Sequence, residues 1–81
     1  MERIGKPIRV AVVFEPGRQI RPVCFDWHNR KHTVTEIVYC WRGQAGEDTL
    51  LYFSVSDGSD LFELVYNTAD QSWTLNGVEV G

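Results

Sequence analysis

Large apolar residues recur at every second position in one segment after another of this 81-residue chain. The alternating positions are Ile8, Val10, Val12 and Phe14; Val23, Phe25 and Trp27; Leu51, Phe53 and Val55; and Phe62, Leu64 and Tyr66. This period of two is typical of strands that bury one face, whereas no stretch of ten residues shows the helical period. The sequence therefore predicts an all-β fold with no substantial helix.

Turn-forming residues divide the chain into about six predicted strands. They cover roughly residues 8–14, 19–27, 32–42, 51–55, 62–66 and 73–75, and the last strand ends at Asn76-Gly77. The short connections between them exclude parallel crossovers, so we expect consecutive strands to pair as an antiparallel meander. Such a meander should curl into a small open barrel or a strongly twisted sheet. The whole chain, residues 1–81, is then a single all-β domain.

Residues 23–42 carry both cysteines, both histidines and two of the three tryptophans. The segment predicts a hairpin that is closed at Asn29-Arg30, with Trp27 opposite His32. His28 and His32 then lie near the turn, where we expect solvated side chains.

The strand that follows this turn has an interrupted parity. Val34 lies at an even position, whereas Ile37, Tyr39 and Trp41 lie at odd positions. A bulge between Val34 and Ile37 would bring all four side chains to the core face. We therefore expect Tyr39 and Trp41 to point inward.

Phe25 and Trp27 are predicted to lie in the core. Their expected neighbours are Val12, Phe53 and Leu64. Turning the two rings outward would turn Asp26 inward, because side chains alternate along a strand. Burying an unpaired carboxylate and exposing two large rings are both unfavourable.

Cys24, His28, His32 and Cys40 have the ligand types of a structural zinc site. In the predicted hairpin, however, Cys40 lies about 26 Å along the strand from His32 at 3.3 Å per residue. Cys40 would face Gln19, which is too far along the neighbouring strand from Cys24 for a disulfide. We therefore expect two free thiols, no metal site and no cofactor.

The chain carries no recognisable catalytic motif. It has no nucleophile elbow, no phosphate-binding glycine loop and no His-Glu-x-x-His pattern. Residues 57–60 have the composition of an Asp-Gly turn, and a calcium loop starting there would have Thr68 where a glutamate is needed. A core this small also rarely encloses a catalytic pocket. We expect no catalytic residues and no enzymatic activity.

Charge is segregated along the chain. All eight basic residues lie at or before position 42, whereas the rest of the chain carries seven acids and no Lys or Arg. Such asymmetry can mark a nucleic-acid partner. The alternative is that outward charges of neighbouring strands offset each other across the sheet. We favour this alternative because the net charge of −3 weakens attraction to polyanions.

Two kinds of binding role remain. Rings interleaved with cations are the mixture that holds single-stranded nucleic acid. The candidate residues for that role are Arg18, Arg21, Arg30, Lys31, Trp41 and Arg42. Because rings should point inward and cations outward, we favour a non-catalytic protein-interaction module that binds another protein or a second copy of itself. An accessory role in binding single-stranded nucleic acid is the alternative.

The predicted second face of the sheet also has apolar members. They are Val38, Cys40, Leu50, Tyr52, Leu61 and Val65. They predict either a barrel closed against the ends of the chain or a patch that binds a second copy.

The chain has no apolar run that approaches the ~20 residues needed to span a bilayer. Its first residues also lack the apolar region of a signal peptide. We therefore expect a cytoplasmic protein with no membrane partner.

A pattern of spaced aromatic residues extends over residues 23–78. Its members are Phe25-x-Trp27, Arg30-x-His32-x-Val34, Ile37, Trp41-Arg42, Tyr52-Phe53-x-Val55, Phe62-Glu63-Leu64, Tyr66 and Trp73-x-Leu75. On these residues the chain resembles a family of small bacterial proteins of unknown function. Some relatives lie near genes for lesion-bypass DNA polymerases, so the resemblance implies an accessory role around DNA. It implies no catalytic residues. Many relatives differ at His28-Asn29 and His32, so it implies no ligand role for these positions either.

Overall fold

A computed structural model describes residues 1–17 and 19–81, and Arg18 lies outside the described residues. Within these ranges the chain forms eight strands and no helix, so the all-β prediction is confirmed with two more strands than expected. The strands are β1 (Glu2–Pro7), β2 (Val10–Val13), β3 (Arg21–Trp27), β4 (Arg30–Thr33), β5 (Glu36–Ala45), β6 (Asp48–Ser56), β7 (Leu61–Asn67) and β8 (Ser72–Glu79). The described residues accordingly include no helix that is long and apolar enough to cross a membrane.

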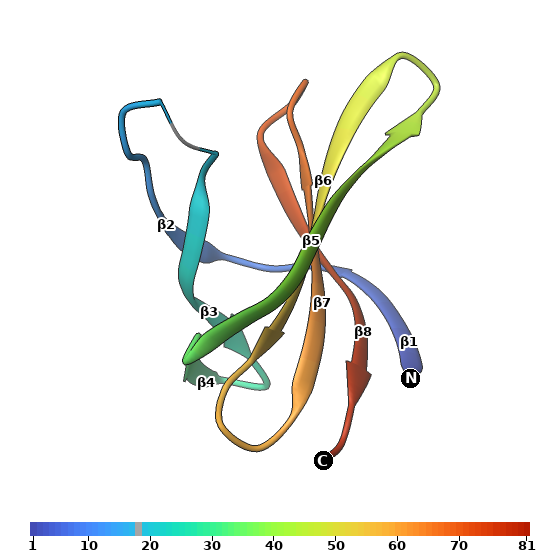
Figure 1. Cartoon of the computed structure of the whole chain (residues 1–81). Coiled ribbons are helices and arrows are strands. Elements are labelled where there is room, and N and C mark those ends of the chain that lie inside the picture. The colour runs from blue at the N-terminus through green and yellow to red at the C-terminus, as the bar shows by residue number, and fades with distance from the viewer. Residues whose placement is uncertain (18) are drawn as a thin grey trace.

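The strands form two antiparallel sheets (Figure 1). The large sheet has the order β1-β8-β7-β6-β5, and the small sheet has the order β2-β3-β4. Each contains a meander of consecutive strands, as the short connections predict. β1 is the exception, because it comes from the start of the chain and pairs with β8 near the end. Neither sheet closes into a barrel.

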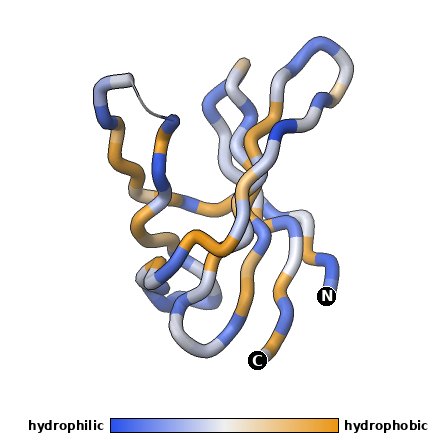
Figure 2. The backbone as a smooth tube through the Cα atoms, viewed as in Figure 1, coloured by the Kyte–Doolittle hydropathy of each residue, from blue (hydrophilic) through white to orange (hydrophobic). Residues whose placement is uncertain are grey.

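The core lies between the two sheets. Its buried side chains are Phe25, Leu51, Phe53, Val55, Phe62, Leu64, Trp73 and Leu75. Phe25 comes from the small sheet and packs its ring edgewise on Phe62, with centroids 4.9 Å apart. Figure 2 shows the hydrophobic stretches along the strands and largely hydrophilic turns at their ends. Phe25 is buried as predicted, whereas Trp27 packs against the border of the core and stays partly exposed.

The single strand predicted at 32–42 is in fact two strands, β4 and β5, which belong to different sheets. The chain crosses between the sheets at Val34-Thr35. Thr35 donates its backbone N–H and its hydroxyl to the carbonyl of Ser56, at 2.8 and 3.1 Å. These two bonds attach the crossing to the large sheet. Val34 and Ile37 both pack against the core, as predicted.

The bulge in this region lies later than predicted. It falls between Ile37 and Tyr39, where Val38 is the additional residue. Trp41 therefore lies opposite Tyr52, which alternates with buried neighbours and points away from the core. The prediction that Tyr39 and Trp41 face the core is wrong, and Tyr39 is 65% exposed.

The β3–β4 hairpin turns at His28-Asn29 and not at Asn29-Arg30. Both turn residues have positive φ, 52° and 58°, as a type I′ turn requires. Asn and His adopt this conformation more readily than most residues. The pairing moves by two positions, so that His32 lies opposite Phe25 instead of Trp27. A shift of two leaves each side chain on its predicted face.

The sequence pattern does not predict β1, and it predicts an end for the last strand, at Asn76-Gly77, that is too early. β1 contains glycine, proline and two basic residues, which are not typical of strands. It forms beside the open edge of β8, and Gly5 at φ 68° accommodates a register shift between Arg3 and Lys6. Gly77, predicted as a turn residue, instead continues β8 to Glu79.

Candidate functional site

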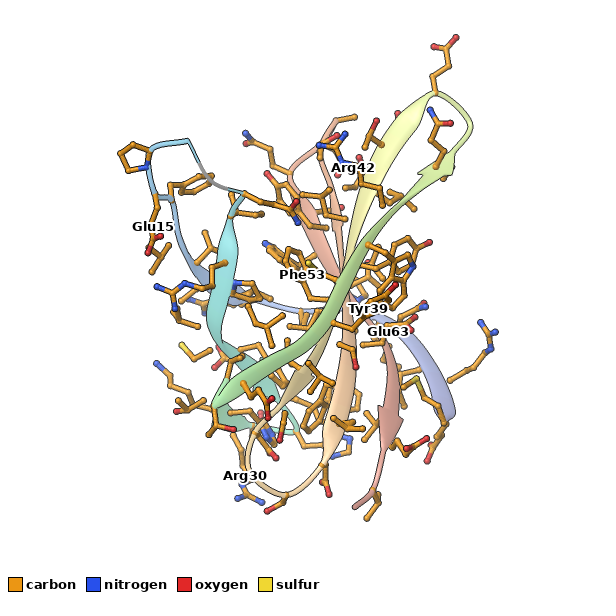
Figure 3. The ribbon with its side chains drawn as sticks, in the orientation of Figure 1. Glu15, Arg30, Tyr39, Arg42, Phe53 and Glu63 are labelled. Atoms are coloured by element: carbon orange, nitrogen blue, oxygen red, sulfur yellow. The ribbon has the colours of Figure 1, made fainter. Side chains whose placement is uncertain are left out.

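Three aromatic side chains form a row on the outer side of the large sheet. This aromatic row consists of Tyr39 and Trp41 of β5 and Tyr52 of β6. Trp41 and Tyr52 lie directly opposite each other, and their rings stack with centroids 5.1 Å apart and planes 8° apart. Tyr39 extends the row along β5, with its ring 5.4 Å from that of Trp41. Figure 3 shows Tyr39 on the opposite side of the sheet from the core residue Phe53.

Gly43 provides the space that the row needs. It lies next to Trp41 on the same side of β5, and the ring of Tyr52 leans over it. A Cβ atom at position 43 would lie 2.7 Å from Cε1 of Tyr52. The row thus depends on the bulge at Val38, which turns Tyr39 and Trp41 outward, and on a glycine beneath Tyr52.

The residues around the row are apolar, neutral polar or acidic, and Ser54 lies directly opposite Tyr39. On the same face, Val65 of β7 lies opposite Tyr52 and Leu50 lies two residues before it on β6, and both are partly exposed. Glu63 of β7 also lies on this face, where Asn76 Nδ2 donates a hydrogen bond to its carboxylate. The outer face therefore exposes aromatic rings and aliphatic side chains beside a negative charge.

The basic residues of the large sheet lie away from the row. Among the described residues, they are Arg3, Lys6 and Arg42. Lys6 is paired with Leu75 and Arg42 with Leu51, which are both buried, so these two cations lie on the core side. Arg3 lies on β1, at the opposite edge of the sheet from β5. No cation of the described sheet therefore adjoins the aromatic row.

The structure does not bring the predicted nucleic-acid residues into one site. Arg18 lies outside the described residues, and Arg21 begins β3, where it pairs with a glutamate. Trp41 and Arg42 are neighbours in the sequence but lie on opposite sides of the sheet. Figure 3 shows Arg30 and Arg42 at opposite ends of the molecule.

Arg30 and Lys31 do share a site with a ring. They lie opposite Trp27 and Asp26 in the β3–β4 hairpin. Together with Arg9, these residues border an open hollow of about 720 Å³. This hollow is where the structure places a partly exposed ring beside several cations.

A histidine–aspartate pair connects the two sheets. Nδ1 of His32 in β4 lies 3.0 Å from Oδ2 of Asp57 in the β6–β7 turn, and their side chains are 13% and 16% exposed. The imidazole stacks on Phe25 at 5.1 Å and lies 5.2 Å from the ring of Phe62. The expectation of a solvated His32 is wrong. The predicted hairpin places His32 opposite Trp27, and cross-strand partners share a face, which was the signal for an inward side chain.

The β6–β7 turn keeps the Asp57 carboxylate ionised. The backbone N–H groups of Ser59 and Asp60 each donate to its Oδ1 at 2.9 Å. Although partial burial opposes ionisation, the hydrogen bonds from Asp60, His32 and Ser59 hold the pKa of Asp57 at about 2, below its ordinary 3.8. An ionised carboxylate only accepts hydrogen bonds, so Nδ1 of His32 carries the hydrogen. Nε2 of His32 is buried and has no hydrogen-bond partner among the described residues.

The two cysteines are free thiols in different sheets. Cys24 is half-buried in β3, and Cys40 is exposed on β5, where it lies opposite Phe53 and not opposite Gln19. Residues 1–17 and 19–81 contain no group of three or more His, Cys, Asp or Glu side chains that could hold a metal ion.

Comparisons of the chain with family models, with curated proteins and with solved structures found no match.

Proposed function

We propose that this chain is a non-catalytic protein-interaction module of the bacterial cytoplasm, and that the aromatic row is its docking surface. One observation carries the proposal. Tyr39, Trp41 and Tyr52 stand together on the outer side of a sheet, where Tyr39 is 65% exposed and the other two rings are partly exposed. Tyr and Trp are enriched at the centres of protein interfaces, where charged residues are depleted.

The arrangement of the rings favours a protein partner over a nucleic acid at this surface. Trp41 and Tyr52 stack face to face, so each ring covers one face of the other. A base stacks on the free face of a ring, and its phosphates need nearby cations. The described cations of the large sheet lie on its core side or at its far edge, while Glu63 lies on the outer face. A side chain of a protein partner can pack against the row without nearby cations.

The contacts of His32 and Asp57 support a structural role for these two ionisable side chains. A catalytic base must come within hydrogen-bond reach of a proton on its substrate. Nδ1 of His32 is already bonded to Asp57, and Nε2 is buried. The pair is accordingly suited to joining the sheets.

Site-specific photo-cross-linking in cells tests the docking surface. A benzophenone amino acid replaces Tyr39 in one variant and Phe14 in a control, because Phe14 is similarly exposed at 72% but lies outside the row. We expect discrete protein adducts from position 39, lost when Trp41→Ser is added, and only background from position 14. Equal adducts from both positions, or none from position 39, would exclude the row as a docking surface.

A second candidate function is supported by the hollow beside Trp27. Arg9, Arg30 and Lys31 line the same hollow as a partly exposed ring, and rings combined with cations can hold a short single strand of nucleic acid. Accessory binding of single-stranded nucleic acid would use this hollow and would weaken steeply with salt.

An oligonucleotide titration at low salt tests this second candidate. We expect Arg30→Glu combined with Lys31→Glu to abolish binding. The matched control is Arg21→Glu combined with Arg42→Glu, which makes the same change in net charge away from the hollow and should retain binding. A wild-type chain that fails to bind at low salt would eliminate the candidate.

A further inference from the structure

We propose that two copies of this chain associate through β5, which pairs antiparallel with β5 of the second copy about a two-fold axis at Cys40. The proposal rests on the proposed function, because it identifies the partner of the aromatic row as a second copy of the chain. Pairing of this kind extends the sheet and joins the two rows into one continuous row.

β5 is the sheet edge with the least protection against pairing. Proteins protect edge strands with short length, basic residues, proline or bulges. β2 and β4 have four residues each, and β4 begins with Arg30-Lys31. β1 contains Gly5, Lys6 and Pro7 and is interrupted by a register shift. β5 has ten residues and contains no Lys or Pro; its single basic residue is Arg42, and its bulge at Val38 precedes a regular stretch from Tyr39 to its end.

Exposed apolar surface is concentrated on the same strand. Among the described residues, the large hydrophobic residues that are at least half exposed are Met1, Phe14, Val38, Tyr39 and Val80. Only Val38 and Tyr39 lie within a strand, and both belong to β5. Within the described chain β5 is paired on one side only, with β6, so its other edge is open. A second β5 would cover apolar side chains and satisfy backbone groups together.

The backbone of β5 presents Cys40 to the open edge. The β5–β6 hairpin has a two-residue turn between Ala45 and Asp48, and such a turn is flanked by a hydrogen-bonded pair. Pair types alternate along an antiparallel ladder, so Tyr39 and Trp41 direct their N–H and C=O groups to β6. Cys40 lies between them and directs its own groups to the open edge.

The side chains select this register among its neighbours. With the axis at Cys40, Tyr39 of each copy lies opposite Trp41 of the other, on the outer face of both sheets. An axis at Arg42 would instead place the two Arg42 side chains opposite each other, which is destabilising. An axis at Trp41 would direct Tyr39 to Gly43 of the second copy, where the ring of Tyr52 already lies. The axis at Cys40 therefore avoids like charges and a blocked position.

Sedimentation velocity over a concentration series tests the association. We expect the apparent mass of the wild-type chain to rise from 9.3 kDa toward twice that value. Cys40→Lys places two like charges at the axis and should hold the mass at that of the monomer. Thr33→Lys is the matched control on the edge strand β4 and should behave as wild type. A wild-type mass that stays at 9.3 kDa throughout the series would overturn the proposal.

Cross-linking with a short bis-maleimide tests the register. In a Cys24→Ser background, only Cys40 reacts, and we expect a covalent dimer. In a control, Cys24→Ser and Cys40→Ser are combined with Thr33→Cys, which moves the single thiol to an exposed position on β4. A dimer yield at Cys40 no higher than that of the control would overturn pairing about this axis.

The same experiments separate this proposal from the proposed function. If the purified chain is monomeric while position 39 still cross-links to a different protein in cells, self-pairing is wrong and the docking surface stands. If position 39 yields no adduct, both are wrong.

Discussion

The two sides of the large sheet are built from similar residues and differ in what covers them. Phe53 on the core side lies under the small sheet and is 2% exposed, whereas its neighbour Tyr52 stacks on Trp41 at the surface. The core side also encloses its polar pair, since His32 and Asp57 bond to each other between the sheets. The difference shows that aromatic rings on the two sides of one sheet can have different roles. Those under the small sheet hold the fold, and those on the outer side form the docking surface that we propose.

Truncation of a core-side ring should have the largest effect. Phe53→Ala should lower the free energy of unfolding by about 3–5 kcal/mol, the range for a buried aromatic residue. The outer-side control Tyr52→Ala should lower it by about 1 kcal/mol or less, the size of a cross-strand pair. Denaturant unfolding measures both. Equal losses in the two variants would contradict the distinction between the two sides.

Removal of the charge that connects the sheets should have the next largest effect. The folded-state pKa of Asp57 is about 2 against an ordinary 3.8, so its contribution is present above about pH 4 and is lost as the pH falls toward 2. Asp57→Asn should cost about 2 kcal/mol at pH 7, because each pKa unit corresponds to about 1.4 kcal/mol.

Unfolding free energies measured from pH 7 to pH 2 check this expectation. The difference between wild type and Asp57→Asn should shrink as the pH falls below 4. Asp26→Asn is the control, since Asp26 is exposed, and it should cost little at either pH. A wild-type advantage that grows toward pH 2 would show that the assigned sign is wrong.

Substitution of Gly43 should disturb the outer side with a small change in stability. The added Cβ of Gly43→Ala would meet the end of the Tyr52 ring, which can move aside, so we expect a loss of about 1 kcal/mol or less. The stacking on Trp41 should change more than the stability does. Near-ultraviolet circular dichroism would report the stacking. An unchanged aromatic spectrum would mean that Tyr52 does not lean on Gly43.

Replacement of the most exposed ring should have the smallest effect on stability. Tyr39→Ser should change the free energy of unfolding by about 0.5 kcal/mol or less, as is usual for surface positions. The same variant should lose self-association in sedimentation. A large loss of stability would mean that Tyr39 supports the fold.

The burial pattern of the central strands is determined by the sequence itself. Leu51, Phe53, Val55, Phe62 and Leu64 lie in the core as their alternation predicts. Alternation is a local property of the backbone, because successive side chains of any strand point to opposite sides. Short connections are equally local, and they determine the antiparallel pairing of consecutive strands.

The tertiary structure alone decided which residues belong to which sheet. The hydrogen bonds from Thr35 to Ser56 divide one predicted strand into two. β1 forms because it pairs with the edge of β8. The place of the bulge was likewise decided by pairing with β6, and it turned Tyr39 and Trp41 outward. A bulge changes the side of every later residue in its strand, while its position depends on a partner distant in the sequence. The periodicity of the chain therefore determined its core, and the contacts between distant strands decided where its exposed rings lie.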